Sequence, residues 1–175
     1  MSQTLRKNGM ELEIHDACTS ACAQYLMVAA SKVEISENAV VSFHLNSFGI
    51  LKMVDENDIK KFNIEEIKNN RKRAENLYLK KGVSLTLLEE STYQVEPLCL
   101  QSNPQGEQLI NKYDFWIPTE NYLKNLGVKF QGFWPKNIKE AKNLAKLHYV
   151  SSAKFKFGVD NVSNFRRKIV RCDSY

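Results

Sequence analysis

Residues 10–30, MELEIHDACTSACAQYLMVAA, decide the fold, because they join a strand pattern to a helix pattern through a very short connection. Every second residue from 10 to 14 is apolar, which is the period of a strand with one buried face. Residues 16–19 then predict a turn. The small and straight-chain residues from 20 to 31 predict a buried helix. The expected order is strand, tight turn and helix, with Ser20 at the junction.

A serine at such a junction has two interpretations. It can cap the N-terminus of the following helix. It can also be the nucleophile of a hydrolase, exposed where a strand turns sharply into a helix whose free N–H groups face a developing oxyanion. A nucleophilic serine needs a general base, and the chain offers His15, His44 and His148. His44 has the best position, because it ends an apolar stretch at residues 39–43 that predicts a strand.

The remaining sequence predicts further helices and short strands. In chain order we expect the end of a helix at residues 2–8, strands at 33–35 and 39–43, two exposed helices between 55 and 92 with a break at Gly82, a loop or small hairpin at 94–112, a short helix to residue 126 capped by Thr119, an amphipathic helix at 138–147 and a strand at 154–158.

Two segments carry a resemblance to a known family. CTSACAQYL at residues 18–26 and VEISENAVVSFH at residues 33–44 resemble the Clp protease and crotonase-like superfamily, most closely its Clp-type serine peptidase branch. The resemblance covers roughly residues 1–128. It implies an α/β fold, a ClpP/crotonase-like spiral of ββα units with a helical handle, truncated at its N-terminus. Residues 129–175 are then a basic C-terminal extension packed on the same domain.

The same resemblance assigns roles to individual residues. Ser20 matches the nucleophile, His44 the general base, and Asp114, in the segment YDFWIPTE at residues 113–120, the acid that orients the imidazole. The backbone N–H of Ala21 matches one oxyanion donor. The resemblance therefore implies a serine hydrolase, in the first instance a peptidase, that acts on peptide or protein substrates through an acyl-enzyme. It implies no metal and no organic cofactor.

Two features leave alternatives open. The family takes its second oxyanion donor from an upstream Gly-Gly pair, which this sequence does not contain. A catalytically inactive oligomeric scaffold or binding protein, paired through the handle helices at residues 57–92, is therefore the alternative function. The long segment that precedes Asp114 leaves three other candidates for the acid, Glu96, Glu107 and Asp160.

The four cysteines bear on the compartment. Cys18 and Cys22 are four residues apart, a spacing that permits a disulfide on a helix, whereas Cys99 and Cys172 have no near neighbour. A disulfide beside Ser20 would imply an oxidising compartment. As the sequence stands we expect a cytoplasmic protein, and a periplasmic one if a signal segment precedes it.

Two further functions remain as alternatives. His15, Cys18, Cys22 and His44 have the side-chain types of a zinc site, although their spacing matches no familiar zinc pattern. An acyl-CoA-binding crotonase is the other possibility. Ser20 and His44 together fit acyl transfer through a covalent intermediate better than enolate chemistry.

Composition excludes several classes of protein. The chain has 175 residues, of which 43% are hydrophobic, enough for a core without metal or disulfides. Its longest apolar run, at residues 25–30, is too short to span a membrane. Residues 129–175 hold 11 Lys and Arg against 3 Asp and Glu, but no nucleic-acid motif accompanies them, so we expect a solvated basic surface. Phe115, Trp116 and Trp134 are expected in the core rather than along a groove.

Overall fold

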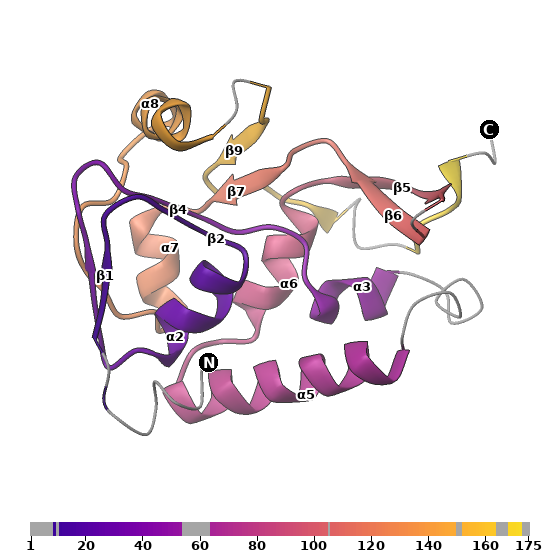
Figure 1. Ribbon diagram of the computed structural model, residues 1–175, viewed down its shortest axis with the longest axis horizontal. Helices are drawn as coiled ribbons and strands as arrows, with labels where there is room; N and C mark the ends of the chain where they lie inside the picture. Colours follow the sequence, from indigo (N-terminus) through magenta and orange to yellow (C-terminus); the bar gives the residue numbers. More distant parts are fainter. Residues whose placement is uncertain are drawn as a thin grey trace.

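The fold is a mixed α/β arrangement of small sheets and helices (Figure 1). The computed structural model describes residues 9, 11–53, 64–104, 106–149, 152–163 and 168–172. The helix expected at residues 2–8 lies outside the described residues. In the described part, no helix is both long and apolar enough to cross a membrane.

The first half of the chain repeats one arrangement of two strands followed by a helix. The first unit contains β1 (Glu11–Ile14), β2 (Ala17–Thr19), the π-helix η1 (Cys22–Leu26) and its continuation α2 (Met27–Ala29). The second unit contains β3 (Lys32–Ile35), β4 (Val40–Ser42) and α3 (Ser47–Met53). The units stack in register, because β1 pairs in parallel with β3 and β2 pairs in parallel with β4.

The sequence pattern explains this stacking. Ile14, Val33 and Ile35 are buried while their neighbours in the same strands are exposed or half-buried, so β1 and β3 turn one apolar face to the core. All three residues of β4 are buried, as expected for a strand covered on both faces. The structure thus confirms the strands predicted at residues 33–35 and 39–43, which are β3 and β4.

The second half of the chain completes the sheets and adds most of the helical structure. In order it contains α5 (Ile64–Lys81), α6 (Thr86–Tyr93), β5 (Pro97–Asn103), β6 (Gly106–Asn111), β7 (Phe115–Ile117), α7 (Glu120–Asn125), β8 (Gln131–Gly132), α8 (Ile138–His148) and β9 (Phe155–Phe157). β8 pairs in parallel with β3, and β7 pairs in parallel with β9. An antiparallel bridge between Phe43 and Trp116 joins β7 to the end of β4.

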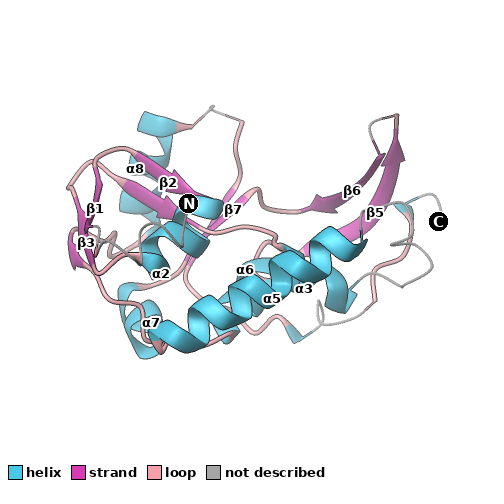
Figure 2. Ribbon diagram, turned by 60° about the horizontal axis from the view of Figure 1, so that its bottom comes forward, coloured by secondary structure: helices cyan, strands magenta, loops and turns pink. Residues whose placement is uncertain are grey.

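Helix α5 forms one side of the molecule. It packs its buried residues Ala74, Leu77 and Tyr78 toward α2 and α3, and Figures 1 and 2 show it running past both of them. The antiparallel hairpin of β5 and β6 projects at the end of the molecule farthest from β1 (Figure 1). A positive φ of 68° at Gly82 follows the last turn of α5, which is the backbone conformation that ends helices.

The main hydrophobic core draws on both the first and the last third of the chain. Ala23, Phe43 and Trp116 are fully buried at its centre. Trp134 and Ala141, from the basic C-terminal stretch, belong to the same cluster. Trp116 and Trp134 are therefore core residues, as the sequence predicts, whereas Phe115 is only half-buried.

Two predictions about secondary structure are wrong. Residues 17–19 form strand β2 instead of a turn, because pairing with β4 keeps this short segment extended. Helix α6 is buried rather than exposed, since Leu87, Leu88 and even Ser91 lose nearly all contact with solvent against α3. The predicted hairpin at 94–112, the short helix capped by Thr119, the amphipathic helix and the last strand are all confirmed.

All four cysteines are paired. Cys18 is joined to Cys22, with 5.2 Å between their Cα atoms, and Cys99 is joined to Cys172 across 73 residues of sequence. The first disulfide brackets Ser20. The second ties the β5–β6 hairpin to the C-terminal segment, next to a parallel bridge between Leu100 and Arg171.

Candidate active site

Ser20 lies in a strained backbone conformation between β2 and η1. Its φ is 55°, in the left-handed region that residues with a Cβ atom occupy at a cost of about 1–2 kcal/mol. Two contacts hold the segment in this shape: the Cys18–Cys22 disulfide, and a 2.8 Å hydrogen bond from the Gln24 N–H to the Ser20 carbonyl oxygen. Such strain persists where the surrounding structure imposes it, and it concentrates at functional sites.

The Ser20 hydroxyl does not cap the helix. The cap position of η1 belongs to Ala21, and no side chain accepts a hydrogen bond there. No described residue hydrogen-bonds the Ser20 side chain, which is half-buried. The N-cap interpretation is therefore wrong, and the hydroxyl is available to another group.

Backbone donors directly follow Ser20 in the chain. The N–H groups of Ala21 and Cys22 belong to the first turn of η1, where a helix has no earlier carbonyl to accept them. Donors in this position stabilise the negative charge that develops on a carbonyl oxygen under attack. η1 is also a π-helix, a rare form that is frequent at functional sites.

His44 reaches the same sheet edge as Ser20. In the parallel pair of β2 and β4, Thr19 lies opposite Ser42, so Ser20 follows the end of β2 and His44 lies two residues past the end of β4, at the same end of the pair. Gln24, which is buried, donates a 2.6 Å hydrogen bond from Nε2 to the His44 carbonyl oxygen. The helix that follows Ser20 is thereby bonded directly to the segment that carries His44.

The imidazole of His44 lies in an aromatic setting. Its ring contacts Phe115 edge-on, with 6.0 Å between the ring centroids. Phe115 in turn stacks on Tyr149 and Phe155, with centroid distances of 4.9 and 5.5 Å. Burial lowers the pKa of His44 from its ordinary value of 6.5, so the ring is neutral at pH 7 and can accept a proton.

Asp114 stands next to Phe115, but its carboxylate is used elsewhere. Oδ2 accepts a 2.7 Å hydrogen bond from the backbone N–H of Lys154, and the residue is exposed. None of its hydrogen bonds within the described chain goes to His44. The strand pairing thus places the segments that carry Ser20 and His44 side by side, while the Asp114 carboxylate holds the segment before β9.

Two of the other acid candidates belong to a separate ionic cluster. Glu96, in a left-handed conformation with φ of 52°, binds Lys156 through Oε1 at 2.8 Å and Lys112 through Oε2 at 2.7 Å. Burial acts to raise the pKa of Glu96, but the hydrogen bonds from both lysines outweigh it and hold the pKa below its ordinary value. Asp160 pairs with the same Lys156 at 3.2 Å. Glu107 lies in β6, and its side chain is outside the described part of the structure.

The zinc alternative is not supported. The disulfide between Cys18 and Cys22 leaves no thiolate for a metal. His15 is exposed and bonds Ser36 through Nδ1 at 2.8 Å. Among the described residues, no group of three or more His, Cys, Asp or Glu side chains has the arrangement of a metal site.

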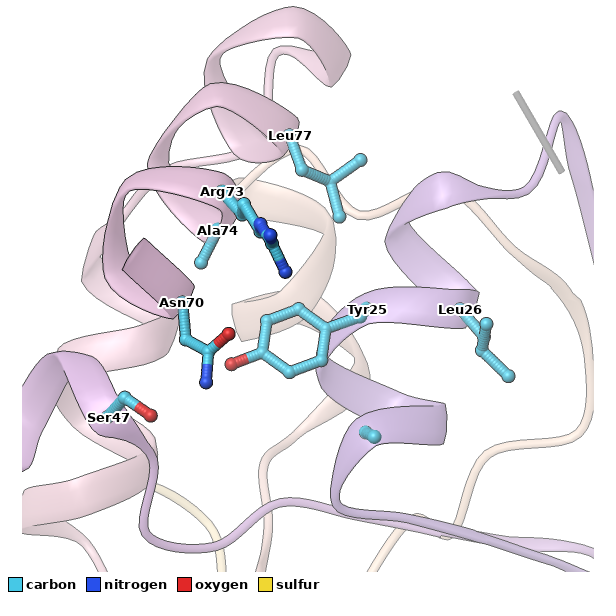
Figure 3. A pocket seen from close by; sticks show the side chains of 8 residues that line it. Tyr25, Leu26, Ser47, Asn70, Arg73, Ala74 and Leu77 are labelled. Carbon is cyan, nitrogen blue, oxygen red and sulfur yellow. The ribbon is translucent and has the colours of Figure 1, made fainter. Parts of the chain in front are cut away.

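A pocket of about 390 Å³ opens beside the site (Figure 3). One wall comes from the segment after Ser20 and consists of Ala21, Tyr25 and Leu26. Because Ala21 follows Ser20 directly in the chain, the pocket begins one residue from the candidate nucleophile. Its size suits a small ligand or a single side chain.

The opposite wall comes from α5. Asn70, Arg73, Ala74 and Leu77 line it, and Ser47 closes one end. In Figure 3 the side chains of Arg73 and Asn70 point toward the ring of Tyr25, while Leu77 supplies an apolar surface. Sequence reasoning missed these residues, because nothing in the pattern of α5 distinguishes a lining polar residue from a solvated one.

Two other residues near Ser20 and His44 are absent from the sequence prediction. Gln24 lies four residues after Ser20, and this one-turn spacing is a signal that the sequence does contain. Tyr149 bonds the Ser42 hydroxyl at 3.1 Å and also lies against Thr19. Tyr149 comes from the end of α8, far away in the sequence, and has no such signal.

The strain at Ser20 yields a prediction about stability. Glycine adopts a φ near 55° without the Cβ clash, so Ser20→Gly should be more stable than Ser20→Ala by about 1 kcal/mol. Urea unfolding of both variants, followed by circular dichroism, measures the difference. Equal midpoints would contradict the left-handed conformation.

Comparisons with known proteins returned no relative: no family model, no curated protein and no solved structure matches this chain.

Proposed function

We propose that this chain is a ClpP-like serine hydrolase that cleaves peptides through an acyl-enzyme. The observation that carries the proposal is the conformation of Ser20. Its hydroxyl bonds no described residue, its φ is 55°, and it leaves the sheet at the same edge as a neutral histidine. A nucleophile on a strained turn between a strand and a helix is the arrangement that hydrolases use.

The stacking of the strands supports a ClpP/crotonase-like spiral. Two successive units of two strands and a helix lie on each other, with β1 parallel to β3 and β2 parallel to β4. β8 continues the first sheet in parallel on the far side of β3. In this proposal α5 is the helical handle.

The mechanism follows from the groups at the sheet edge. His44 removes the proton of the Ser20 hydroxyl while Oγ attacks the substrate carbonyl carbon. The backbone N–H groups of Ala21 and Cys22 receive the resulting oxyanion. The protonated His44 gives its proton to the leaving amine as the C–N bond breaks, and a water activated by His44 then hydrolyses the acyl-enzyme.

Asp114 is the proposed orienting acid. Asp114 enters through the family resemblance, and its described hydrogen bond goes to Lys154. Two other contacts position His44: Gln24 donates a hydrogen bond to its backbone carbonyl, and Phe115 packs on its imidazole ring. Ser20 and His44 are therefore the minimal machinery, and Asp114 is a third member.

The pKa of His44 sets the expected pH dependence. Only the neutral imidazole can take the proton of Ser20, and burial lowers the pKa of His44 below 6.5. The rate of Ser20 acylation should therefore stay constant from pH 8 to pH 7 and reach half its maximum at a pH below 6.5. Initial labelling rates with a fluorophosphonate across this range measure the midpoint. A midpoint above 6.5 would contradict a buried neutral base.

The experiment for the hydrolase is a comparison of matched serine variants. Wild-type protein, Ser20→Ala and Ser163→Ala are assayed against mixed peptides and short-chain p-nitrophenyl esters. Ser163 is exposed and far in sequence from the site, so its variant should keep full activity. Loss of all turnover in Ser20→Ala alone supports the proposal, and equal turnover in all three proteins contradicts it.

An inactive scaffold is the second candidate function. It is favoured by the hydrogen bond between the Asp114 carboxylate and Lys154, since this bond leaves His44 without an acid partner among the described residues. Both candidates include a homo-oligomer built through the handle helices. They differ in turnover: the hydrolase loses its activity in Ser20→Ala, whereas the scaffold has no activity that depends on Ser20.

The disulfides support a location outside the cytoplasm. Both pairs of cysteines are bonded, and structural disulfides form and persist in oxidising compartments. We therefore place the hydrolase, as part of the proposal, in the periplasm or a comparable compartment.

A further inference from the structure

The pocket next to Ser20 has a polar lining on one side. Arg73 and Asn70 are three residues apart on α5, so their side chains lie on the same face of that helix. Tyr25 faces them from η1, and Figure 3 shows the guanidinium, the amide and the phenol ring gathered within the pocket. Leu26, Ala74 and Leu77 supply the apolar remainder.

The charge of the pocket is positive. None of its described lining residues is an Asp or a Glu. The nearest carboxylate along α5, Glu75, is paired with Arg71 at 2.8 Å, and no described carboxylate forms an ion pair with Arg73. A guanidinium remains protonated at every physiological pH, so the pocket carries one cation without a described counter-ion.

The donors around this cation fit a carboxylate. The arginine fork can donate two parallel hydrogen bonds to the oxygens of one carboxylate, and the Asn70 amide can add a third. Burial raises the pKa of Tyr25, so its hydroxyl stays protonated and is a donor as well. A neutral amide presents an NH₂ group to the same donors and fits less well.

We propose that this pocket binds the acidic side chain of a substrate residue, so that the hydrolase selects peptides with Glu or Asp on the acyl side of the scissile bond. The choice of the acyl side rests on the proposed function, because it assumes that the substrate carbonyl lies at Ser20, one residue from the pocket wall at Ala21. The carboxylate preference itself rests only on the lining.

The test measures binding rather than turnover. Three capped pentapeptides that differ only at the central residue, Glu, Gln or Leu, are titrated calorimetrically into the Ser20→Gly variant, which cannot consume them. We expect the Glu peptide to bind about tenfold more tightly than the Gln peptide, as for one charge-assisted contact at a partly exposed site. Arg73→Gln in the same background should reduce this ratio to about one.

A neighbouring lysine provides the matched control. Lys72 is exposed on α5 and is not part of the pocket lining, so Lys72→Gln removes the same charge and should keep the tenfold ratio. Equal binding of the Glu and Gln peptides, an unchanged ratio in Arg73→Gln, or no binding of any peptide would each overturn the inference.

Failure of the proposed function gives a different result. Wild-type protein is labelled in parallel with a fluorophosphonate, which reports on Ser20 and does not need the pocket. A Glu preference without labelling contradicts the hydrolase and leaves the acidic-ligand pocket in place. Labelling without a Glu preference supports the hydrolase and contradicts the pocket.

Discussion

His44→Gln should slow the acylation of Ser20 by about 10²–10⁴-fold, the usual contribution of a positioned general base. Glutamine preserves a polar side chain of similar reach but cannot take the proton of the hydroxyl. The folded structure should survive, because the contact between Gln24 and this segment uses the backbone carbonyl of residue 44 rather than its ring. Initial rates of fluorophosphonate labelling, followed by intact mass, give the ratio.

A histidine outside the site serves as control for this variant. His15 is exposed, and within the described part of the chain its ring bonds Glu13 and Ser36 and no residue of the site, so His15→Gln should label at the wild-type rate. If His44→Gln labels as fast as His15→Gln, then His44 is not the base and the proposed mechanism is wrong. A melting temperature close to that of the wild type in both variants shows that both are folded, so that a difference in labelling rate reflects the loss of the base and not unfolding.

The double variant Cys99→Ser/Cys172→Ser should lose about 4 kcal/mol of stability. The bond closes a loop with a sequence separation of 73 residues, and in the chain-entropy description a crosslink of that length restricts the unfolded chain strongly. Guanidinium unfolding of the oxidised wild type and of the variant measures the difference. The denaturant dependence should steepen in the variant, because its unfolded state is less compact.

The Cys18–Cys22 disulfide serves as the comparison for this loss of stability. Cys18 and Cys22 are only four residues apart, so removing their bond releases a much shorter loop and should destabilise the protein less. Its removal should instead slow labelling of Ser20, because the bond is one of two constraints on the left-handed backbone there. If the long-range variant unfolds at the wild-type midpoint, the Cys99–Cys172 pairing is contradicted.

Local patterns account for the parts of the fold that the sequence predicts correctly. The two-residue period before Ser20, the run of small residues after it and the hydroxyl at Thr119 each act within a few residues, so their elements form where expected. β2 has no such signal. It is a strand because β4 lies beside it, and that neighbour comes from more than twenty residues later in the chain.

The candidate site shows the same division between local and distant causes. Ser20 and His44 can be identified from the segments around them, and the bond from Gln24 to the His44 carbonyl joins these segments in space. The φ of Ser20, the aromatic support from Tyr149 and the charge of the pocket at Arg73 all depend on contacts between distant segments. Tertiary packing determines these three features, and the periodicity of the sequence does not reveal that packing.

Intact-mass analysis after fluorophosphonate treatment shows whether Ser20 is an activated nucleophile. Wild-type protein should gain the mass of one adduct, digestion should map the adduct to the peptide that contains Ser20, and Ser20→Ala should gain none. A wild-type chain that gains no adduct while a reference serine hydrolase is fully labelled, or an equal adduct on Ser20→Ala, would contradict an activated Ser20.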